Sequence, residues 1–327
     1  MSKDKPKKPL ISILMAVYEP RMDWLREQLL SLDAQTYPNL KLCIRDDCSP
    51  TVPIEDIEAC VKACIHAFPF ELRRNEENLG SNETFERLTR ENGGDYFAYC
   101  DQDDIWLPEK LAVLQAVIEA ENALMVCSDM VIIDGEGRQT ADSITQIRRH
   151  HVFKSGEGLA PQLLIRNFAT GCTMLVDAHA AREAVPFCPY MVHDHYLALW
   201  CAAKGKVISL PDRLIRYRIH EDNQTPIMAG VTDKATYLQL RILRLEQRLR
   251  WLEERFRGCD GLEQEIEGAL EWATAREANF RGHFSAKGKV WRLRRYSPMV
   301  SLFEIVLTGA PEGIFMGVIR LNKINAI

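Results

Sequence analysis

The chain has 327 residues, of which 46% are hydrophobic and 27% are charged, and its formal net charge is −5. This length can hold one large α/β domain with an appendage or two ordinary domains, and the composition excludes disordered and collagen-like proteins. The ten cysteines include no C-x-x-C pair, which excludes zinc-ribbon and zinc-finger patterns. No apolar export signal is visible at the N-terminus, so we expect these scattered thiols to lie in a reducing cytoplasm.

The charge is distributed unevenly along the chain. From Arg281 to the end there are eight Lys or Arg residues and two acids, a net charge of +6. The preceding 280 residues hold 33 bases and 44 acids, a net charge of −11. An acidic body with a basic tail argues against nucleic-acid binding by the main domain, and it predicts that an anionic partner meets the C-terminus.

Segments typical of strands and of helices alternate over the first 215 residues. Residues 11–18, ISILMAVY, are continuously apolar, as in a buried parallel strand. Helices are expected between Pro20 and Pro38, near 54–68, at 81–92, from Pro108 to about 118, and at 194–204. Further strands are expected at 40–45, 70–74, 95–100, 124–133, 172–176 and 206–210. This alternation predicts an α/β fold, a mostly parallel sheet with helices on both faces.

The pattern changes in three later segments. Residues 135–160 form a polar stretch with a basic run from Arg148 to His151, typical of a long loop that is mobile or functional. Residues 234–256 carry Leu or Ile at three- and four-residue spacing, which predicts either a helix packed on the body or a self-associating coiled coil. Residues 299–319 are largely apolar but are interrupted by two glutamates and a proline. They make a poor membrane span and predict either an interfacial amphipathic segment or core packing.

An acidic cluster, Asp101-Gln102-Asp103-Asp104, follows the strand expected at 95–100. Open α/β sheets bind ligands at the carboxyl ends of their strands. Carboxylates this close repel one another unless a cation lies between them, and oxygen ligands suit Mg²⁺ or Mn²⁺, which would bridge the protein to a diphosphate. The alternative is an acidic turn in which Asp104 favours the N-terminus of the following helix.

Other polar residues follow neighbouring strands. Asp46 and Asp47 end the strand at 40–45 and should lie on the same edge of the sheet, where they either accept hydrogen bonds from a base or ribose or form a turn. Asn78 and Gly80 follow the third strand, and Gly80 either admits close approach of a ligand or closes a turn. No G-x-G-x-x-G motif or Walker A loop is present. This argues against a dinucleotide-binding protein and leaves a metal ion to neutralise phosphates.

Two histidine-containing segments complete the candidates. His193-Asp194-His195 opens a helix, where the helix dipole favours an ionised aspartate. A proton-accepting Asp194 therefore needs a desolvated pocket or a charged neighbour, and the alternative role is N-capping alone. His220 either contacts a metal or phosphate or has neither role.

Together these segments resemble the inverting family 2 glycosyltransferases of GT-A fold, and they are most similar to bacterial rhamnosyltransferase-type members. The resemblance rests on ISILMAVYEP, IRDDCSP, NEENLGS, YCDQDDIWLPEKL, NFATGCTMLV, HDHYLAL and YRIHEDNQT, which occur in the family's order over residues 9–225. YCDQDDIWLPEKL is the most specific of them. Residues 81–92 lack the run of small residues that many members show, and the chain from 233 onward lies outside the resemblance.

The resemblance implies a set of site residues. Asp101 and Asp103 match the metal-binding D-x-D motif, and the implied cofactor is Mg²⁺ or Mn²⁺. Asp194 matches the catalytic base, and His220 matches a late histidine that reaches the metal or the diphosphate. The implied nucleotide-binding positions are Ala16, Tyr18, Glu19, Asp46, Asp47, Asn78, Gly80, Asp101 and Gln102.

The reaction implied is a single displacement with inversion. Rhamnose or another hexose would pass from a dTDP- or UDP-sugar to a hydroxyl of a glycan or lipid-linked acceptor, in bacterial cell-surface polysaccharide or lipopolysaccharide synthesis. We expect residues 1–232 to form the cytoplasmic catalytic domain, and residues 233–327 to form a helical extension whose tail contacts the inner face of the plasma membrane.

The alternatives to a glycosyltransferase are a sugar nucleotidyltransferase and a non-catalytic sugar-binding protein. A metal-dependent sugar nucleotidyltransferase would carry a Gly-rich N-terminal loop with Arg or Lys, which the sequence lacks. A non-catalytic sugar-binding protein of the same fold would be free to lose the polar positions needed for turnover, and all of these are present.

Overall fold

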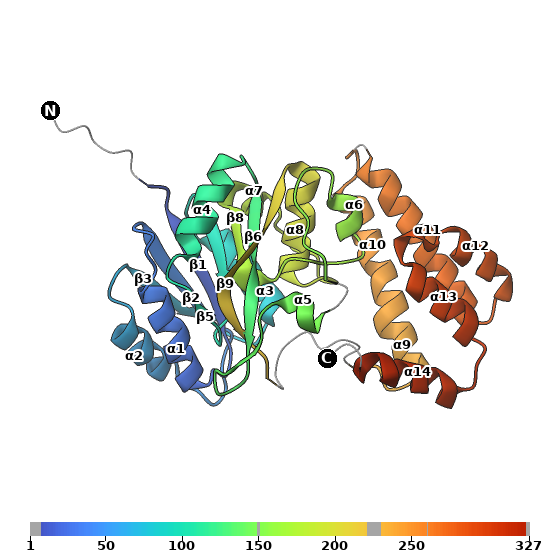
Figure 1. Cartoon of the computed structure of the whole chain (residues 1–327), viewed down its shortest axis with the longest axis horizontal. Coiled ribbons are helices and arrows are strands. Elements are labelled where there is room, and N and C mark those ends of the chain that lie inside the picture. The colour runs from blue at the N-terminus through green and yellow to red at the C-terminus, as the bar shows by residue number, and fades with distance from the viewer. Residues whose placement is uncertain (1–7, 149–150, 221–229, 260, 325–327) are drawn as a thin grey trace.

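The computed structural model describes residues 8–148, 151–220, 230–259 and 261–324 of the chain. A sheet forms the centre of one part of the molecule, and the C-terminal helices form the other part beside it (Figure 1). The described residues form nine strands in the order β3-β2-β1-β4-β8-β6-β9-β5, with β7 paired to β6. The strands are β1 (Ile11–Val17), β2 (Leu40–Asp46), β3 (Phe70–Arg74), β4 (Tyr96–Cys100), β5 (Ile105–Trp106), β6 (Met125–Ile133), β7 (Gln139–Ala141), β8 (Met174–Asp177) and β9 (Val207–Arg218).

The N-terminal half of the sheet is parallel. β1 lies between β2 and β4, and β2 pairs with β3, all in parallel register. The helices α1 (Met22–Asp33), α2 (Ile54–Cys64) and α3 (Ser81–Glu91) return the chain to the same end of the sheet after each strand. All residues of β1 except Ala16 are buried, as expected for an apolar strand that is covered on both faces.

The second half of the sheet mixes both directions. β8 lies between β4 and β6 and is antiparallel to both, and β5 is antiparallel to β9, whereas β6 and β9 are parallel. The chain after β6 does not return through a helical crossover, so β8 enters the sheet from the opposite end. The predicted α/β fold class is confirmed, with more antiparallel pairing than the sequence pattern indicates.

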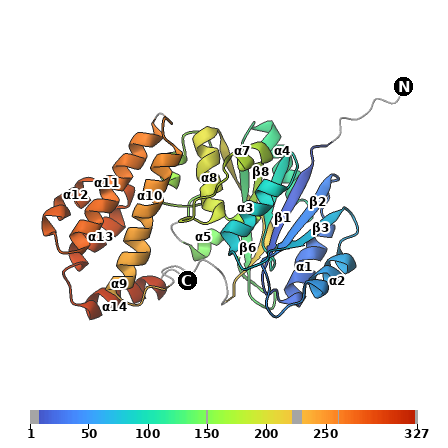
Figure 2. The same cartoon turned by 180° about the vertical axis from the view of Figure 1, so that it is seen from behind.

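Helices cover both faces of the sheet (Figures 1 and 2). The apolar sides of α1, α2 and α4 (Lys110–Ala120) pack with Ile13 of β1 in one buried cluster. The apolar sides of α3, α7 (Ala178–Glu183) and α8 (His193–Lys204) pack with Leu14 in a second cluster on the other face. Successive residues of a strand point to opposite faces, so β1 contributes to both layers.

The helix α4 begins later than expected. Its first residue is Lys110, whereas the sequence predicts a helix that starts at Pro108. The Leu107 N–H donates to the Leu214 carbonyl in β9, and the Pro108 carbonyl accepts from the Thr36 N–H after α1. The backbone of these two residues is thus engaged by neighbouring elements before the helix starts.

The strand β9 is longer than expected. It runs to Arg218, whereas the sequence predicts a strand that ends near 210. Its register against β6 skips from Leu210 to Arg213, which is a bulge that contains Pro211. Because proline cannot donate to a ladder, a bulge is one of the few places where a strand accepts it. The continuation carries the chain to the acidic cluster that follows β4.

Residues beyond 233 form helices. These are α9 (Lys234–Tyr237), a π-helical segment η2 (Leu238–Leu243), α10 (Arg244–Arg255), α11 (Leu262–Phe280), the 3₁₀ turn η3 (Phe284–Ala286), α12 (Lys287–Arg292), the 3₁₀ turn η4 (Arg294–Tyr296), α13 (Pro298–Leu307) and α14 (Glu312–Ile324). The apolar stretch predicted at 299–319 is therefore split between α13 and α14. Among the described residues, no helix is both long and apolar enough to cross a membrane.

The leucine stripe of α10 packs on the body of the protein. Leu249 and Leu252 are fully buried in the cluster that also contains the apolar side of α8. The ring of Trp251 lies 5.4 Å from that of Tyr196, and the Arg248 guanidinium donates to the Leu164 carbonyl at 2.8 Å. Of the two alternatives for this segment, the structure shows the packed helix. The division between residues 232 and 233 stays a prediction.

Candidate functional site

Three strand ends bring polar residues to one edge of the sheet. In the parallel register, Val17 of β1 lies beside Asp46 of β2, and Met15 lies beside Cys100 of β4. The segments after these strands therefore meet, as the sequence predicts. Gln102 joins two of them, because its amide accepts from the Tyr18 N–H at 2.9 Å and donates to the Tyr18 carbonyl at 3.0 Å.

The predicted nucleotide-binding acids already accept hydrogen bonds within the protein. Asp46 accepts from the Ser49 hydroxyl at 2.5 Å and forms an ion pair with Arg74 at 3.3 Å. Asp47 accepts from the Asn75 side chain and from the backbone N–H groups of Leu79 and Gly80, at 2.8 to 2.9 Å. Both side chains are buried, so they hold the loops after β2 and β3 in place.

Glu19 and Gly80 also shape this edge. Glu19 has φ of 44° and accepts from the Thr51 N–H at 2.8 Å and from the Val52 N–H at 3.2 Å. These hydrogen bonds, led by that of the Thr51 hydroxyl, lower the pKa of Glu19. Gly80 has φ of +79° and precedes α3, and its N–H also donates to the Asn78 side chain, so it closes a turn. Ala16 is half-buried near the end of β1.

Asp101 and Asp104 lie close to Cys172, in the 3₁₀ turn η1 (Gly171–Thr173). One ligand atom from each lies within 4.8 Å of the other two. Burial and the neighbouring Asp103 raise the pKa of Asp101 to about 7, and burial raises the pKa values of Asp104 and Cys172 well above their ordinary values. Within the described chain, Asp104 Oδ2 is buried without a hydrogen-bond partner. The carboxylates of Asp101 and Asp104 lie close together, and one of their buried oxygens has no hydrogen-bond donor among the described residues, an arrangement that suits a divalent cation.

Asp104 does not cap the following helix, which was its alternative role. Its Oδ1 accepts from the backbone N–H of Arg218 at 3.0 Å and so ties the acidic cluster to β9. Lys110 is fully buried beside the cluster, and its ammonium donates to the Cys172 carbonyl at 2.6 Å. Burial lowers the pKa of Lys110 to about 7.

Asp103 and His220 are in direct contact. The imidazole Nε2 of His220 donates to Asp103 Oδ2 at 2.7 Å. The ring of His220 also lies 4.8 Å from that of Trp24 in α1. The structure thus brings together two of the three residues that the sequence predicts as metal ligands. The residues 221–225, which end the last matching segment, lie outside the described part of the chain.

Asp194 lies at the first turn of α8 and is bound to Gly171, which precedes the Cys172 that lies beside Asp101 and Asp104. Its Oδ1 accepts from the Asn167 side chain and its Oδ2 accepts from the Gly171 N–H, both at 3.1 Å. Burial raises the pKa of Asp194 to about 6, and its carboxylate contributes in turn to the raised pKa of Asp101. A raised pKa is what a proton acceptor at this position requires, and the role itself stays a prediction.

The two histidines beside Asp194 are buried and neutral. Burial lowers the pKa values of His193 and His195 to about 3. His193 packs 4.1 Å from the ring of Phe85, and His195 donates to the Leu163 carbonyl at 2.6 Å. A Cβ atom on Gly171 would lie 2.7 Å from His193 Nε2, so glycine is required there for close packing. Neither histidine supplies a charge near Asp194.

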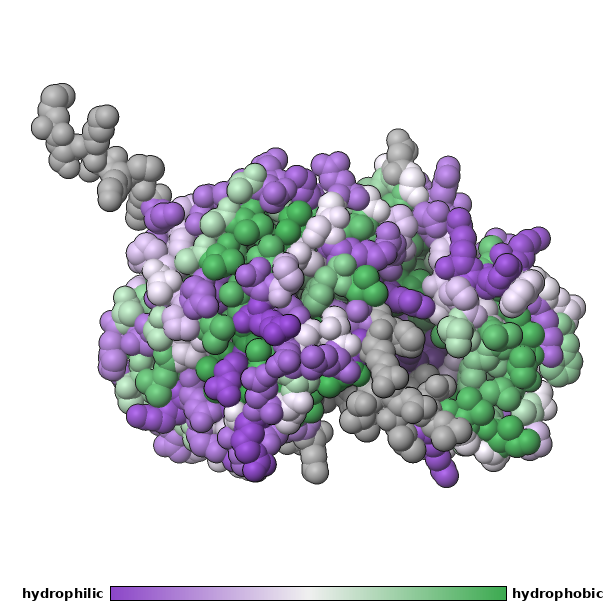
Figure 3. Space-filling view, in the orientation of Figure 1, coloured by the Kyte–Doolittle hydropathy of each residue, from purple (hydrophilic) through white to green (hydrophobic). Residues whose placement is uncertain are grey.

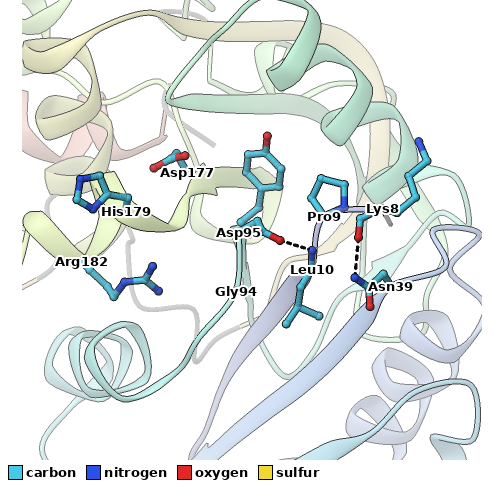
Figure 4. Close-up of a pocket in the computed structure, with 10 residues that line it drawn as sticks. Lys8, Pro9, Leu10, Asn39, Gly94, Asp95, Asp177, His179 and Arg182 are labelled. Carbon is cyan, nitrogen blue, oxygen red and sulfur yellow. Dashed lines mark hydrogen bonds between the residues drawn. The ribbon is translucent and has the colours of Figure 1, made fainter. Parts of the chain in front are cut away.

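A pocket of about 580 Å³ lies at the opposite edge of the sheet (Figure 4). It is lined by the residues that precede β1, β2 and β4, including Leu10, Asn39 and Asp95. The Asp95 carboxylate accepts from the Leu10 N–H at 2.6 Å. None of the predicted site residues lines this pocket, so it is separate from the site described above.

Sequence reasoning missed several residues of this edge. Cys172 lies within the matching segment NFATGCTMLV, but no metal-ligand spacing surrounds it. Lys110 lies on the helix α4 and carries no signal of burial. Arg218 is 1% exposed, and its guanidinium donates to the backbone carbonyls of Asp103 and Gly135. Its place beside the cluster follows from the unexpected length of β9.

The comparison with protein families agrees with this geometry. Residues 12–181, just over half of the chain, match the family described as "Glycosyl transferase family 2". The chain therefore belongs to glycosyltransferase family 2, and the predicted resemblance is confirmed.

Two curated relatives illustrate the range of similarity. A dTDP-rhamnosyl transferase of Shigella flexneri is 24% identical over 246 residues, which are 70% of this chain and 79% of that protein. An abequosyltransferase of Salmonella typhimurium is 29% identical over 144 residues, which are 43% of this chain and 40% of that protein. The chain spans less than half the length of several curated relatives that it matches.

Two solved structures share the fold. S. aureus TarS 1–349 in complex with UDP-GlcNAc has a TM-score of 0.56 at 15% identity, over 91% of this chain and 81% of that chain. The mannosyltransferase of Pyrobaculum calidifontis in complex with GDP-Man and Mn²⁺ has a TM-score of 0.53 at 15% identity, over 98% of this chain and 86% of that chain. At these identities the likeness is one of fold, and it agrees with the predicted GT-A class.

Proposed function

We propose that this protein transfers rhamnose or another hexose, with inversion, from a nucleoside-diphosphate sugar to a hydroxyl of a glycan or lipid-linked acceptor. A dTDP- or UDP-sugar is the proposed donor, and bacterial cell-surface polysaccharide, including lipopolysaccharide, is the proposed product. The observation that carries the proposal is the placement of a half-buried Asp194, which accepts from the Gly171 N–H, beside Cys172 and the acidic cluster that follows β4. The site then holds a candidate proton acceptor and a candidate diphosphate site together.

The proton acceptor in this proposal is Asp194. An acceptor hydroxyl is a poor nucleophile, and removing its proton during attack typically contributes about 10²–10⁴-fold. Burial raises the pKa of Asp194 toward neutrality, which makes its carboxylate a stronger base than an exposed aspartate. The hydrogen bonds from Asn167 and Gly171 fix the orientation of this carboxylate at the start of α8.

The diphosphate side of the site is formed by Asp101, Asp103 and His220. These residues would hold Mg²⁺ or Mn²⁺, and Asp104 lies close enough to Asp101 to join them. When bound, such a cation neutralises the diphosphate and stabilises it as a leaving group. His220, oriented by Asp103 and Trp24, is placed to contact a phosphate oxygen at the same site.

The nucleoside side is proposed at the ends of β1, β2 and β3. The pairing of Gln102 with the Tyr18 backbone fixes the distance between the nucleoside side and the diphosphate side. Tyr18 is 43% exposed, so its ring is free to stack on a base. Ala16, Glu19, Asp46, Asp47, Asn78 and Gly80 complete this surface, chiefly by holding its loops.

Binding and turnover with candidate donors test the proposed function. We expect UDP- or dTDP-sugars to raise the melting temperature only when Mg²⁺ or Mn²⁺ is present, and slow donor hydrolysis to accompany binding. Pyrophosphate release from a nucleoside triphosphate and a sugar phosphate would instead indicate a nucleotidyltransferase. Donor binding without hydrolysis or transfer to any hydroxyl acceptor would indicate a sugar-binding protein.

The pH dependence of turnover tests the state of Asp194. The base must be deprotonated, and burial sets its pKa at about 6. Turnover should therefore hold above this pH and fall about tenfold per unit as pH drops below it, because the protonated fraction grows. We would measure kcat at saturating donor from about pH 5 to pH 8. A flat profile across this range would contradict the assignment.

A further inference from the structure

The helix α13 is packed with its polar side inward. Ser301 and Glu304 are fully buried, and Thr308, which caps the helix, is 8% exposed. Glu304 accepts two hydrogen bonds from the guanidinium of Arg276 in α11, at 2.7 and 2.8 Å. The Ser301 hydroxyl accepts from the Trp272 indole at 3.0 Å. The polar face of this helix is thus fully engaged inside the protein.

The apolar side of the same helix faces solvent. Met299 is 72% exposed, Leu302 is 47% exposed and Val306 is 63% exposed. Their spacing of three and four residues places them on one side of the helix. Ile314, at the start of α14, is 57% exposed. Figure 3 shows a continuous hydrophobic area over α13 and α14 at this end of the molecule.

Basic and aromatic residues precede this apolar surface in the chain. Phe284 and Trp291 are 55% and 48% exposed. Lys287 lies over the ring of Phe284, and Arg294 lies 4.2 Å from the centre of the Trp291 ring. Arg292 is exposed on α12. Aromatic side chains beside cations are typical of residues at the boundary between lipid and water.

We propose that α12, α13 and the start of α14 form a surface that binds an anionic phospholipid bilayer. The helix α13 has ten residues, about half of what a membrane span needs, so it lies along the interface rather than across it. Met299, Leu302 and Val306 enter the headgroup region, and the cations of α12 and η4 meet lipid phosphates. Lipid binding by this surface does not depend on the proposed function. Its use does rest on that function, because the surface would bring the enzyme to a lipid-linked acceptor.

Charge favours the bilayer over a second copy of the chain. In a two-fold dimer the same patch meets itself, so the basic residues of α12 and η4 would approach their own copies. Of the two acids beyond residue 281, Glu304 is neutralised by Arg276 inside the protein. Glu271 of α11 forms ion pairs with Lys289 and Arg292, and Glu265 forms one with Arg295. With the exposed Glu312 these are three acids against the five bases of α12 and η4, so the charge beside the apolar surface is net positive, which suits anionic headgroups and opposes self-association.

Vesicle sedimentation with the full chain tests this surface. We expect binding to vesicles of phosphatidylglycerol and phosphatidylcholine at low salt, and little binding to phosphatidylcholine alone. Met299→Ser with Val306→Ser should weaken binding roughly tenfold, because it removes apolar insertion without changing charge. Arg292→Gln with Arg294→Gln should weaken it by a similar factor, because each base near the surface contributes to binding.

Matched variants of exposed residues elsewhere serve as controls. Leu30→Ser with Leu240→Ser removes two exposed apolar side chains, and Lys62→Gln with Arg90→Gln removes two exposed bases. Both controls should bind vesicles like the unchanged protein. Donor hydrolysis in solution should be the same in all variants. Failed hydrolysis would therefore count against the proposed function and leave the vesicle result unaffected.

Three outcomes would overturn the proposal. The first is that the unchanged protein ignores anionic vesicles at low salt. The second is that the serine variant of α13 binds them as tightly as the unchanged protein. In the third, light scattering shows a dimer that the serine variant converts to a monomer without any vesicle binding, and the partner of this surface is then a second copy of the chain.

Discussion

Asp194→Asn should lower kcat by about two decades or more while nucleotide affinity stays within a few-fold. The amide keeps the size of the side chain and one acceptor for the Gly171 N–H or the Asn167 side chain, so the start of α8 should remain in place. The variant lacks only the group that takes the proton from the acceptor hydroxyl. Steady-state kinetics with donor and acceptor, together with donor affinity by calorimetry, measure both effects.

Asp177→Asn is the matched control for this variant. Asp177 also begins a helix, because it caps α7 and accepts from the Ala180 N–H at 2.8 Å, but it lies at the opposite edge of the sheet. Its replacement removes the same charge and should leave kcat unchanged. Near-normal turnover in Asp194→Asn, or a product that retains the anomeric configuration of the donor, would contradict the role of Asp194 as an inverting base.

Asp103→Ala should abolish the dependence of donor binding on Mg²⁺ or Mn²⁺ and lower kcat/KM by about two decades or more. The variant removes a predicted metal ligand and also the acceptor that orients His220. Donor affinity in Mn²⁺ should fall to the value that the unchanged protein shows in EDTA. Calorimetric titration of UDP and dTDP, with and without EDTA, makes the comparison.

Glu109→Ala is the control for the lost charge. Glu109 lies in the segment that joins the acidic cluster to α4, is exposed, and makes no side-chain cap to that helix. Its removal should leave metal-dependent binding intact. If UDP and dTDP bind the unchanged protein equally well in EDTA, the metal assignment fails for the whole cluster.

The layers of the fold could be predicted from local periodicity. Apolar runs such as Ile11–Val17 and helical stripes such as that of α1 depend only on near neighbours in the chain. The insertion of β8 between β4 and β6 could not be predicted in this way, because strand order depends on contacts between residues far apart in sequence. The length of β9 and the placement of Arg218 beside the acidic cluster could not be predicted for the same reason, because they too depend on contacts with distant strands.

The part of the candidate site that consists of clustered acidic residues could be predicted from the sequence. Three carboxylates in four residues after a strand are visible in the sequence, and Asp103 and His220 prove to be adjacent. Lys110 could not be recognised, because a single lysine on a helix is normally exposed, and its burial depends on Cys172, 62 residues away. The sequence also does not predict which side of α13 faces inward, because its buried Glu304 accepts a hydrogen bond from Arg276 in another helix.

The packing of α10 on α8 determines when the protein can complete its fold. Leu249 and Leu252 belong to the same buried cluster as Phe97 of β4 and Leu197 of α8. A growing chain that ends before α10 leaves those apolar side chains of the sheet layer open to water. The helix that carries Asp194 therefore gains its full support only after the ribosome has released α10. The sheet edge that carries the candidate site and the C-terminal helices should consequently unfold together as one cooperative unit.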